Sequence, residues 1–192
     1  MTRPRVTLKL ATSLDGRIAT ASGESRWLTG PQARERVHEM RAAHDAVLVG
    51  SATAIADDPE LTVRLPDYAG AQPLRVVLTG ETALPPGLKL LSDGGATLVI
   101  PGGPAPAEAL AALAERGLSA VLIEGGGRIA AAFLRAGMVD EIAWFRAPLV
   151  LGAEGRPALG ELAIDRLADA PRFTRLEVEV FGPDLLERYQ RI

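Results

Sequence analysis

Short apolar runs recur along the chain with the two-residue period of a β-strand. In residues 5–11, Val6, Leu8 and Leu10 fall on one face of an extended segment, and Thr7 and Lys9 fall on the other. Similar runs bounded by turn residues predict further strands at 45–50, 74–78, 96–100, 119–123 and 141–146. Two longer runs, 175–181 and 185–191, predict a final hairpin.

Helical signals lie between these strands. The Thr29-Gly30-Pro31 segment puts proline at the first helical position behind a capping residue, which predicts a helix to about Ala43. Further helices are expected at 51–56, at 106–116 before Gly117, and at 128–136 before Gly137. Strands that alternate with helices predict an α/β fold with a mixed, mainly parallel central sheet and helices on both faces. The strand-rich end predicts an antiparallel C-terminal edge.

Composition narrows the class of protein. A chain of 192 residues with 47% hydrophobic residues and no internal repeat predicts a single domain, residues 1–192, in which 152–160 is a loop. The net charge of −3 argues against a basic nucleic-acid-binding protein. The absence of cysteine excludes disulfides and cysteine zinc sites. No apolar run is long enough to span a bilayer or to form a signal-peptide core, so we expect a cytoplasmic protein without membrane contact.

The turn Glu124-Gly125-Gly126-Gly127, between a predicted strand and a predicted helix, is the sharpest local motif. Glycines let backbone N–H groups approach an anion, and the following helix adds its positive end, so the turn predicts a site for a diphosphate. A tight connection without a ligand is the alternative. The spacing is not G-x-G-x-x-G and the turn lies late in the chain, which argues against an ordinary Rossmann domain.

Three charged positions could take part in chemistry. Lys9 interrupts an apolar strand, as a cation in a cleft would, although a lysine on an exposed face is the simpler interpretation. The Asp57-Asp58-Pro59 segment ends a helix where the macrodipole opposes negative charge, so function and a plain helix stop are equally favoured. Glu124 follows a central strand, at the sheet edge where ligands gather in α/β proteins. A strand-end carboxylate with purely structural partners is the alternative.

Other catalytic motifs are absent or weak. His38 and His44, the only histidines, are six residues apart and do not share a helix face, which argues against a two-histidine metal site, so no metal is expected. The sequence has no G-x-S-x-G motif, and a Ser-His-Asp triad is not favoured with so few histidines.

Taken together, several segments resemble the reductase domain of the bacterial riboflavin-biosynthesis deaminase/reductase family. The matching stretches are 8–16 (LKLATSLDG), 22–27 (SGESRW), 54–64 (AIADDPELTVR), 124–127 (EGGG) and 133–137 (FLRAG). The resemblance covers nearly the whole chain, most strongly 6–64 and 121–160. It implies a dihydrofolate-reductase-like fold and a 5-amino-6-(5-phosphoribosylamino)uracil reductase. Such an enzyme uses NADPH to reduce the ribose, through a C1′ imine or the ring-opened sugar, to the ribitylamino product.

The resemblance also implies site residues. Cofactor contacts are expected at Ala11, Trp27, Thr53, Asp57, Gly126, Gly127, Arg128, Ile129, Ala130, Ala131 and Ala132. Substrate contacts are expected at Ser25, Arg41, Leu61, Arg64 and Glu124, where the two arginines suit a 5′-phosphate. Lys9, Asp57 and Glu124 are the catalytic candidates for handling the proton, in no fixed order.

One departure from the two-domain bacterial pattern concerns the substrate. The H-x-E and C-x-x-C zinc signature of the deaminase domain is absent, so we expect no deaminase activity from this chain. Either a separate deaminase supplies the uracil compound, or the chain reduces the still-aminated 2,5-diamino-6-ribosylamino-pyrimidinone 5′-phosphate, as fungal and archaeal stand-alone reductases do; an excised domain is a third possibility. The 61–64 segment favours the deaminated substrate. The family is commonly dimeric, which predicts a homodimer.

Two other functions remain open at this point. A pterin or dihydrofolate reductase would keep the fold and cofactor, but it needs a carboxylate on the 30–43 helix, where Glu35 and Glu39 are not clear candidates. A non-catalytic NADPH-binding regulatory module is the alternative from another class, and the combination of Lys9, Asp57 and Glu124 argues against it.

Overall fold

The computed structural model describes residues 2–92 and 95–192. Along the chain the elements are β1 (Arg5–Thr12), β2 (Arg17–Ala19), α1 (Pro31–Ala42), β3 (Ala46–Gly50), α2 (Ser51–Asp57), β4 (Leu74–Leu78), α3 (Lys89–Ser92), β5 (Thr97–Ile100), α4 (Pro106–Ala114), β6 (Ala120–Ile123), α5 (Gly127–Arg135), β7 (Glu141–Arg146), β8 (Arg156–Pro157), the 3₁₀ turn η1 (Leu167–Asp169), β9 (Phe173–Phe181) and β10 (Asp184–Arg191).

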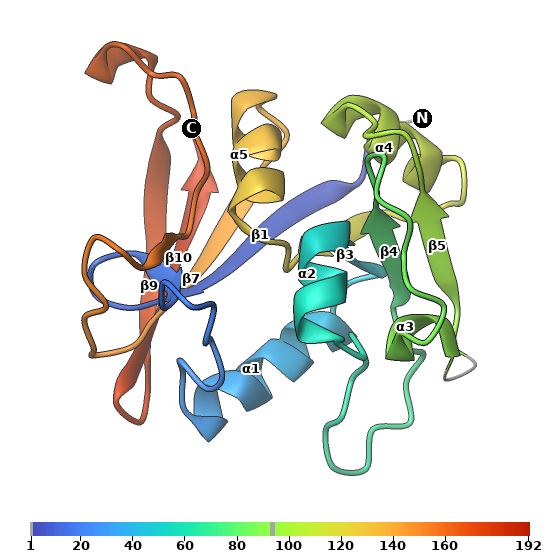
Figure 1. Ribbon diagram of the computed structural model, residues 1–192, viewed down its shortest axis with the longest axis horizontal. Coiled ribbons are helices and arrows are strands. Elements are labelled where there is room, and N and C mark those ends of the chain that lie inside the picture. Colours follow the sequence, from blue (N-terminus) through green and yellow to red (C-terminus); the bar gives the residue numbers. More distant parts are fainter. Residues whose placement is uncertain (1, 93–94) are drawn as a thin grey trace.

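One sheet organises the described residues. Its eight strands run in the order β5-β4-β3-β6-β1-β7-β10-β9. All pairings from β5 to β7 are parallel, and β10 and β9 add an antiparallel edge (Figure 1). β1 lies in the middle, pairing Val6 with Val121 of β6 and Leu8 with Ile142 of β7. The predicted mixed sheet with an antiparallel C-terminal edge is confirmed.

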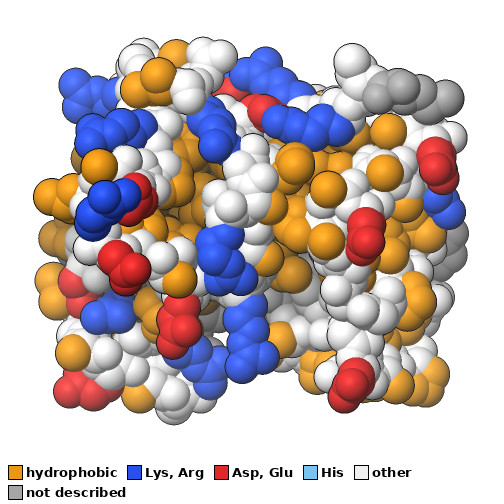
Figure 2. Space-filling model, turned by 90° about the horizontal axis from the view of Figure 1, so that it is seen from above, with side chains coloured by type: hydrophobic (Ala, Val, Ile, Leu, Met, Phe, Trp, Pro, Cys, Tyr) orange, Lys and Arg blue, Asp and Glu red, His pale blue; other side chains and the backbone are white. Residues whose placement is uncertain are grey.

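The antiparallel edge carries apolar side chains in solvent. Leu176, Val178 and Val180 alternate along one face of β9, and Leu185 of β10 stands opposite Val180. All four are exposed, Val180 most of all at 71%. Figure 2, which views the molecule from above Figure 1, shows hydrophobic side chains among charged ones along its left edge, over these strands. At this end of the sheet α1 contacts β10, and its Arg36 lies 3.9 Å from the Glu179 carboxylate of β9.

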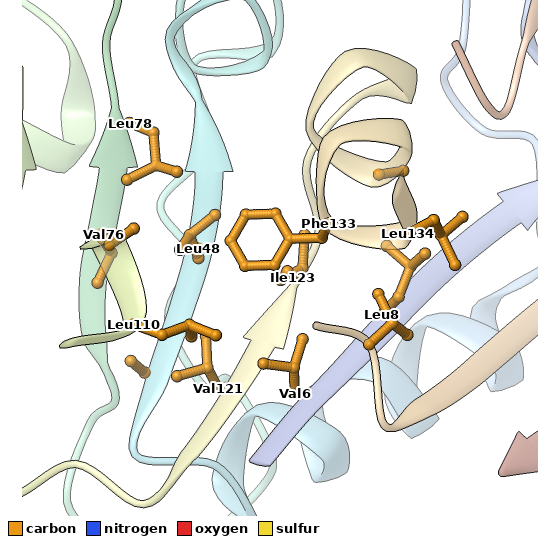
Figure 3. Packing of buried hydrophobic residues seen from close by; sticks show 14 of the residues in the cluster. Val6, Leu8, Leu48, Val76, Leu78, Leu110, Val121, Ile123, Phe133 and Leu134 are labelled. Carbon is orange, nitrogen blue, oxygen red and sulfur yellow. The ribbon is translucent and has the colours of Figure 1, made fainter. Parts of the chain in front are cut away.

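Two hydrophobic cores cover the two faces of the sheet. On one face, α4 and α5 pack Leu110 and Phe133 against Val6, Leu48 and Ile123 (Figure 3). On the other face three helices pack against the strands. Ala33 and Met40 of α1, Ala54 of α2 and Leu90 of α3 contact a core formed by Val47, Val77 and Phe145. The helices on both faces that the strand–helix alternation predicts are therefore present.

Some short elements differ from the prediction. β8 lies within the segment 152–160 that was expected to be a loop, and it pairs with the equally short β2. α3 is a single turn. Elements of two to four residues are too short to show a period, and the β2–β8 pair depends on a contact far apart in sequence. The predicted domain of residues 1–192 includes three positions, 1, 93 and 94, that lie outside the described residues.

Neither a membrane-spanning helix nor a metal-binding cluster is found among the described residues. None of the helices there is long and apolar enough to cross a membrane. Nor do three or more His, Asp or Glu side chains gather in a way that could hold a metal ion.

Candidate active site

A cleft of about 460 Å³ opens beside the carboxyl ends of β1, β3 and β6. Lys9 and Ala11 of β1, Val49 of β3 and Glu124 after β6 lie on its floor, and side chains of α1 and α2 form two walls. The carboxyl ends of parallel strands are the usual ligand sites of α/β sheets. The lining includes six Lys or Arg and four Asp or Glu residues, so the cleft is positive in a protein whose net charge is −3.

Lys9 is the central cation of the floor. Its side chain is half-buried, and among the described residues its ammonium has no hydrogen-bond partner; it lies 5.9 Å from the centre of the Phe145 ring. Burial lowers the pKa of Lys9 below its usual value, the charge of Glu124 partly opposes this, and Arg41 adds to the lowering. The predicted cation in a cleft is therefore present, and its proton is easier to give up than that of an exposed lysine.

Arg41 and Glu124 form a buried, two-pronged ion pair. The Arg41 Nε–H donates to Glu124 Oε1 at 2.6 Å and Nη2–H donates to Oε2 at 2.9 Å, while Nη1–H donates to the carbonyl of Thr62 at 2.9 Å. Burial raises the pKa of Glu124, but the charge and hydrogen bonds of Arg41 outweigh it and hold that pKa at about 2.

This pairing bears on two expectations from the sequence. Arg41 directs three of its five N–H donors to Glu124 and Thr62, so a 5′-phosphate would meet an arginine that is already paired. Glu124 is ionised at neutral pH, so in handling a proton it can accept one but has none to donate. Both residues line the cleft and remain candidates for holding its shape and field.

Arg64, at the cleft wall, has donors without a partner among the described residues. Its Nη1 donates to Glu60 Oε2 at 2.8 Å, and Nε and Nη2 have no partner within the described chain. The side chain is about half exposed at the cleft wall. Leu61, also a predicted substrate contact, has its side chain buried in the core and a left-handed backbone, with φ of 54°. Leu61 can therefore meet a ligand chiefly through its backbone.

His38 connects α1 to the segment that carries Arg64. Its Nδ1 is 3.2 Å from the Arg64 N–H, which donates to it, and 3.1 Å from the carbonyl oxygen of Thr62. Burial lowers the pKa of His38, and the charges of Arg41 and Arg64 lower it further. His38 lines the cleft but was not among the site residues predicted from the sequence.

The segment 25–29 forms the outer wall. Trp27 is 69% exposed and its ring is stacked by the Arg34 guanidinium, 4.4 Å from the ring centre. Arg26 donates to the carbonyl of Asp57, which ties this wall to the end of α2. Ser25 lines the cleft beside them. Trp27 and Ser25 therefore both line the cleft, and their contacts with cofactor and substrate stay predictions.

The two aspartates that end α2 have different environments. Asp58 has a left-handed backbone, and its carboxylate accepts the Lys89 N–H at the start of α3 at 2.8 Å. The Asp57 carboxylate has no hydrogen-bond partner within the described chain, and Asp57 lines the cleft. Asp58 therefore fits the interpretation of a plain helix stop, whereas Asp57 remains a candidate for a functional role.

The glycine turn meets the cleft through Thr53. The Gly126 N–H donates to Thr53 Oγ1 at 3.0 Å, and Thr53 lines the cleft together with Ala11. Gly127 packs so tightly that an added Cβ would lie 3.1 Å from the carbonyl oxygen of Pro157 and the N–H of Gly160. Neither glycine has positive φ, so the turn needs glycine for close approach of backbone to backbone.

The predicted cofactor segment beyond this turn does not line the cleft. Ala130 and Ala131 are buried, and Ala130 belongs to the core under α5, so their side chains are closed to a ligand. Arg128 is exposed, and Ile129 packs partly against the same core. Gly126, Gly127 and Ala132 are half-buried. Only the start of this segment lies next to the cleft, through Thr53.

Arg34, His38 and Lys89 are among the lining residues that were not predicted from the sequence. Arg34 and His38 share a face of α1 with Arg41, because positions 34, 38 and 41 have helical spacing. This helical spacing is visible in the sequence and could have identified both residues. It gives α1 a polar stripe in place of a wholly apolar inner face. Lys89 lines the cleft from α3, and no sequence pattern connects it with residues 9 or 124.

Comparison with known proteins gives a consistent result. Residues 4–186 match the family described as the RibD C-terminal domain. The riboflavin biosynthesis protein RibD of Mycobacterium tuberculosis is 44% identical over 185 residues, which is 95% of this chain and 53% of that protein. A 2,5-diamino-6-ribosylamino-4(3H)-pyrimidinone 5′-phosphate reductase of Methanothermobacter thermautotrophicus is 34% identical over 97% of this chain and 98% of its own length. The chain spans about half the length of most curated relatives reported for it.

Solved structures agree with the sequence matches. RibD of Acinetobacter baumannii superimposes with a TM-score of 0.89 at 34% identity, covering 99% of this chain and 58% of that one. Dihydrofolate reductase from Enterococcus faecalis, complexed with NADP(H) and RAB-propyl, has a TM-score of 0.62 at 17% identity, covering 97% of this chain and 96% of that one. The second likeness shows the fold alone, and it confirms the expected dihydrofolate-reductase-like architecture.

Proposed function

The chain belongs to the RibD C-terminal domain family, and on that premise we propose that it is a nicotinamide-dependent pyrimidine reductase of riboflavin biosynthesis. Its substrate would be a phosphoribosylaminopyrimidine, and its product the ribitylamino compound. The proposal is supported by relatives named for riboflavin biosynthesis and by one named as a pyrimidinone 5′-phosphate reductase over nearly its whole length.

The observation that carries the proposal is the positive cleft with Lys9 on its floor. Its volume of about 460 Å³ lies within the range of small-molecule sites, and its excess of cations suits a phosphorylated ligand. Arg64 offers unpaired Nε–H and Nη2–H donors in the planar fork that binds phosphate oxygens in pairs. Arg64, not Arg41, is therefore the arginine that we assign to the 5′-phosphate.

We assign to Lys9 the role of holding the proton that the reduction requires beside C1′. Reduction of a ribosylamine needs the sugar to open or its C1′–N bond to become a protonated imine, so one group must hold a proton beside C1′. A half-buried ammonium with a lowered pKa and no hydrogen-bond partner within the described chain fits that task. The ion pair of Glu124 and Arg41 sets the local field, and Asp57, the remaining candidate, lies on the opposite wall.

The residues present fit a nicotinamide cofactor. Trp27 presents an exposed ring on which a flat group can stack, and Ala11 and Thr53 leave room beside it. The glycine turn lies behind Thr53 of the cleft and begins α5, and the N-terminus of a helix favours a diphosphate. Bound there, the cofactor supplies the hydride that C1′ of the ribose accepts. We propose NADPH as that cofactor.

The deaminated uracil compound is the substrate form that we favour, from the bacterial pattern of residues 61–64. The still-aminated compound is the second candidate. The observation that supports the aminated form is the match to the Methanothermobacter reductase, which covers almost all of both chains.

The arrangement of α1 argues against a pterin or dihydrofolate substrate. Such a substrate needs a carboxylate on this helix that faces the cleft. Arg34, His38 and Arg41 occupy that face, whereas Glu35 and Glu39 border a separate hollow with the β9–β10 turn. The fold is shared with dihydrofolate reductase, but the described site lacks this recognition group.

The experiment that tests the proposal is the oxidation of NADPH by the purified protein with a panel of acceptors. We expect turnover with 5-amino-6-(5-phosphoribosylamino)uracil, slower turnover with the diamino compound, and none with dihydrofolate. A parallel series with NADH tests the choice of cofactor. Binding of NADPH without turnover on either ribotide would contradict the proposal and favour a regulatory module.

A further inference from the structure

The segment 60–64 is held in place mainly from α1. The carbonyl of Thr62 accepts a hydrogen bond from Arg41, and the backbone of Val63 is bonded in both directions by the side chain of Gln72, at 2.7 and 3.1 Å. The Arg64 N–H has one acceptor in the described structure, Nδ1 of His38. His38 therefore fixes the residue whose side chain carries the free donors of the cleft wall.

Two contacts of His38 Nδ1 belong to different forms of the ring. Nδ1 accepts the Arg64 N–H only when it carries no proton, whereas it donates to the Thr62 carbonyl oxygen, 3.1 Å away, only when it is protonated. The Thr62 oxygen already accepts from Arg41, and the Arg64 N–H has no other acceptor among the described residues, which favours the form with its proton on Nε2. The charged groups around the ring come from three elements: Arg41 on α1, Arg64 and Glu60 on the 60–64 segment, and Glu124 after β6. The cations Arg41 and Arg64 on two sides disfavour an imidazolium, which agrees with the geometry.

We infer that His38 is a positioning residue, which orients Arg64 toward the phosphate of the ligand by accepting its backbone N–H. This inference rests on the proposed function only for the identity of the ligand, a sugar phosphate. His38 itself need not touch the ligand. Replacing it removes the protein acceptor of an exposed N–H, which then bonds to water, and so loosens the backbone that carries the Arg64 side chain.

The variants that test this inference are His38→Leu and His38→Gln. Leucine keeps the volume and cannot accept a hydrogen bond, whereas the glutamine Oε1 can replace Nδ1 as acceptor. We expect His38→Leu to weaken the binding of ribose 5-phosphate about threefold to tenfold, as the net loss of one solvent-accessible hydrogen bond implies, and His38→Gln to restore most of it. Binding of ribose, which lacks the phosphate, and of NADPH should change less than about twofold in both variants.

Arg64→Ala completes a double-mutant cycle. If His38 acts through Arg64, adding His38→Leu to Arg64→Ala gives no further loss of affinity for ribose 5-phosphate. His44→Gln is the matched control, because His44 bonds to Met40 and Thr7 and does not line the cleft. It should leave the binding of ribose 5-phosphate unchanged.

A spectroscopic measurement keeps this test independent of turnover. A long-range ¹H–¹⁵N spectrum of the whole protein should show His38 as the Nε2–H tautomer, with an unprotonated Nδ1. An Nδ1–H tautomer, additive losses in the double variant, or failure of the wild type to prefer ribose 5-phosphate over ribose would each overturn the inference. Absence of turnover on the pyrimidine ribotides, with these results intact, would instead overturn the proposed function alone.

Discussion

At the scale of single residues, the Arg41–Glu124 pair shows what a sequence leaves open. The resemblance placed both residues at the substrate, and the structure places both at the cleft. Arg41 and Glu124 are 83 residues apart in the sequence, so no local spacing could reveal that their side chains bond to each other. A buried ion pair is costly to break from one side, because the remaining charge loses its compensation. The pair therefore stabilises the floor of the cleft, and contact of either residue with a ligand stays a prediction.

Glu124→Gln should destabilise the protein in a way that depends on pH. Glu124 has its pKa lowered from 4.5 to about 2, so its ionised form stabilises the fold fully above about pH 4.5, and this contribution is lost as the pH falls toward 2. We expect the variant to lose about 3 kcal/mol near pH 7, because Arg41 keeps a buried charge, and to lie closer to the wild type near pH 3.

Urea unfolding at the two pH values measures this difference. Glu39→Gln is the control, since Glu39 is half exposed and its ion pair with Arg36 is worth less than about 1 kcal/mol. A loss of stability for Glu124→Gln that is the same at both pH values would contradict the assigned role of the carboxylate.

Lys9→Met should lower turnover far more than substrate binding. Removing a group that delivers a proton costs about 10²- to 10⁴-fold in kcat, while the KM for the ribotide should stay within about threefold. Asp57→Asn serves as the comparison for the second candidate, and Arg116→Met, an exposed cation after α4, controls for loss of charge. Steady-state kinetics of NADPH oxidation decide between them; unchanged kcat in both Lys9→Met and Asp57→Asn would refute the assignment.

At the scale of elements, the strands and helices with clear periods were predictable and the short ones were not. The expected strand at 74–78 coincides with β4, and the expected strand at 141–146 coincides with β7. Each packs a regular apolar pattern against neighbours on the sheet, so local sequence and tertiary structure agree. β2, β8 and α3 arise from contacts between distant segments, which a single sequence does not display.

The glycine turn is the element where function and packing are hardest to separate. Gly127→Ala should disturb the start of α5, because the new Cβ would lie 3.1 Å from two backbone atoms of the 157–160 segment. We expect a loss of about 1–3 kcal/mol in stability and weaker NADPH binding. Gly87→Ala, where nothing lies within 4 Å of an added Cβ, is the control and should be neutral.

Calorimetric titration with NADPH and thermal unfolding measure the two effects separately. Equal NADPH affinity in Gly127→Ala and in the wild type would show that the turn serves packing alone, and would remove it from the cofactor site.

At the scale of the whole molecule, the sheet edge is incomplete. Leu176, Val178, Val180 and Leu185 are exposed on β9 and β10, where Figure 2 shows hydrophobic side chains among charged ones, and edge strands of this kind are usually covered. We propose that a second copy of the chain covers it, as the expected homodimer requires. Light scattering should then give about twice the mass of 20.2 kDa, and Val178→Lys should reduce it to that of one chain. A wild type that already has the mass of one chain would contradict the dimer.

The central claim is that the cleft over β1, β3 and β6 brings a nicotinamide and a phosphoribosyl pyrimidine together for reduction. The most direct test uses NADPH that carries deuterium at its transferable position, with mass spectrometry of the pyrimidine product. The account predicts one deuterium per product molecule, located at C1′ of the ribityl chain, and loss of this product in Lys9→Met. NADPH left unconsumed, with no ribityl product from either the uracil or the diamino ribotide, would contradict it.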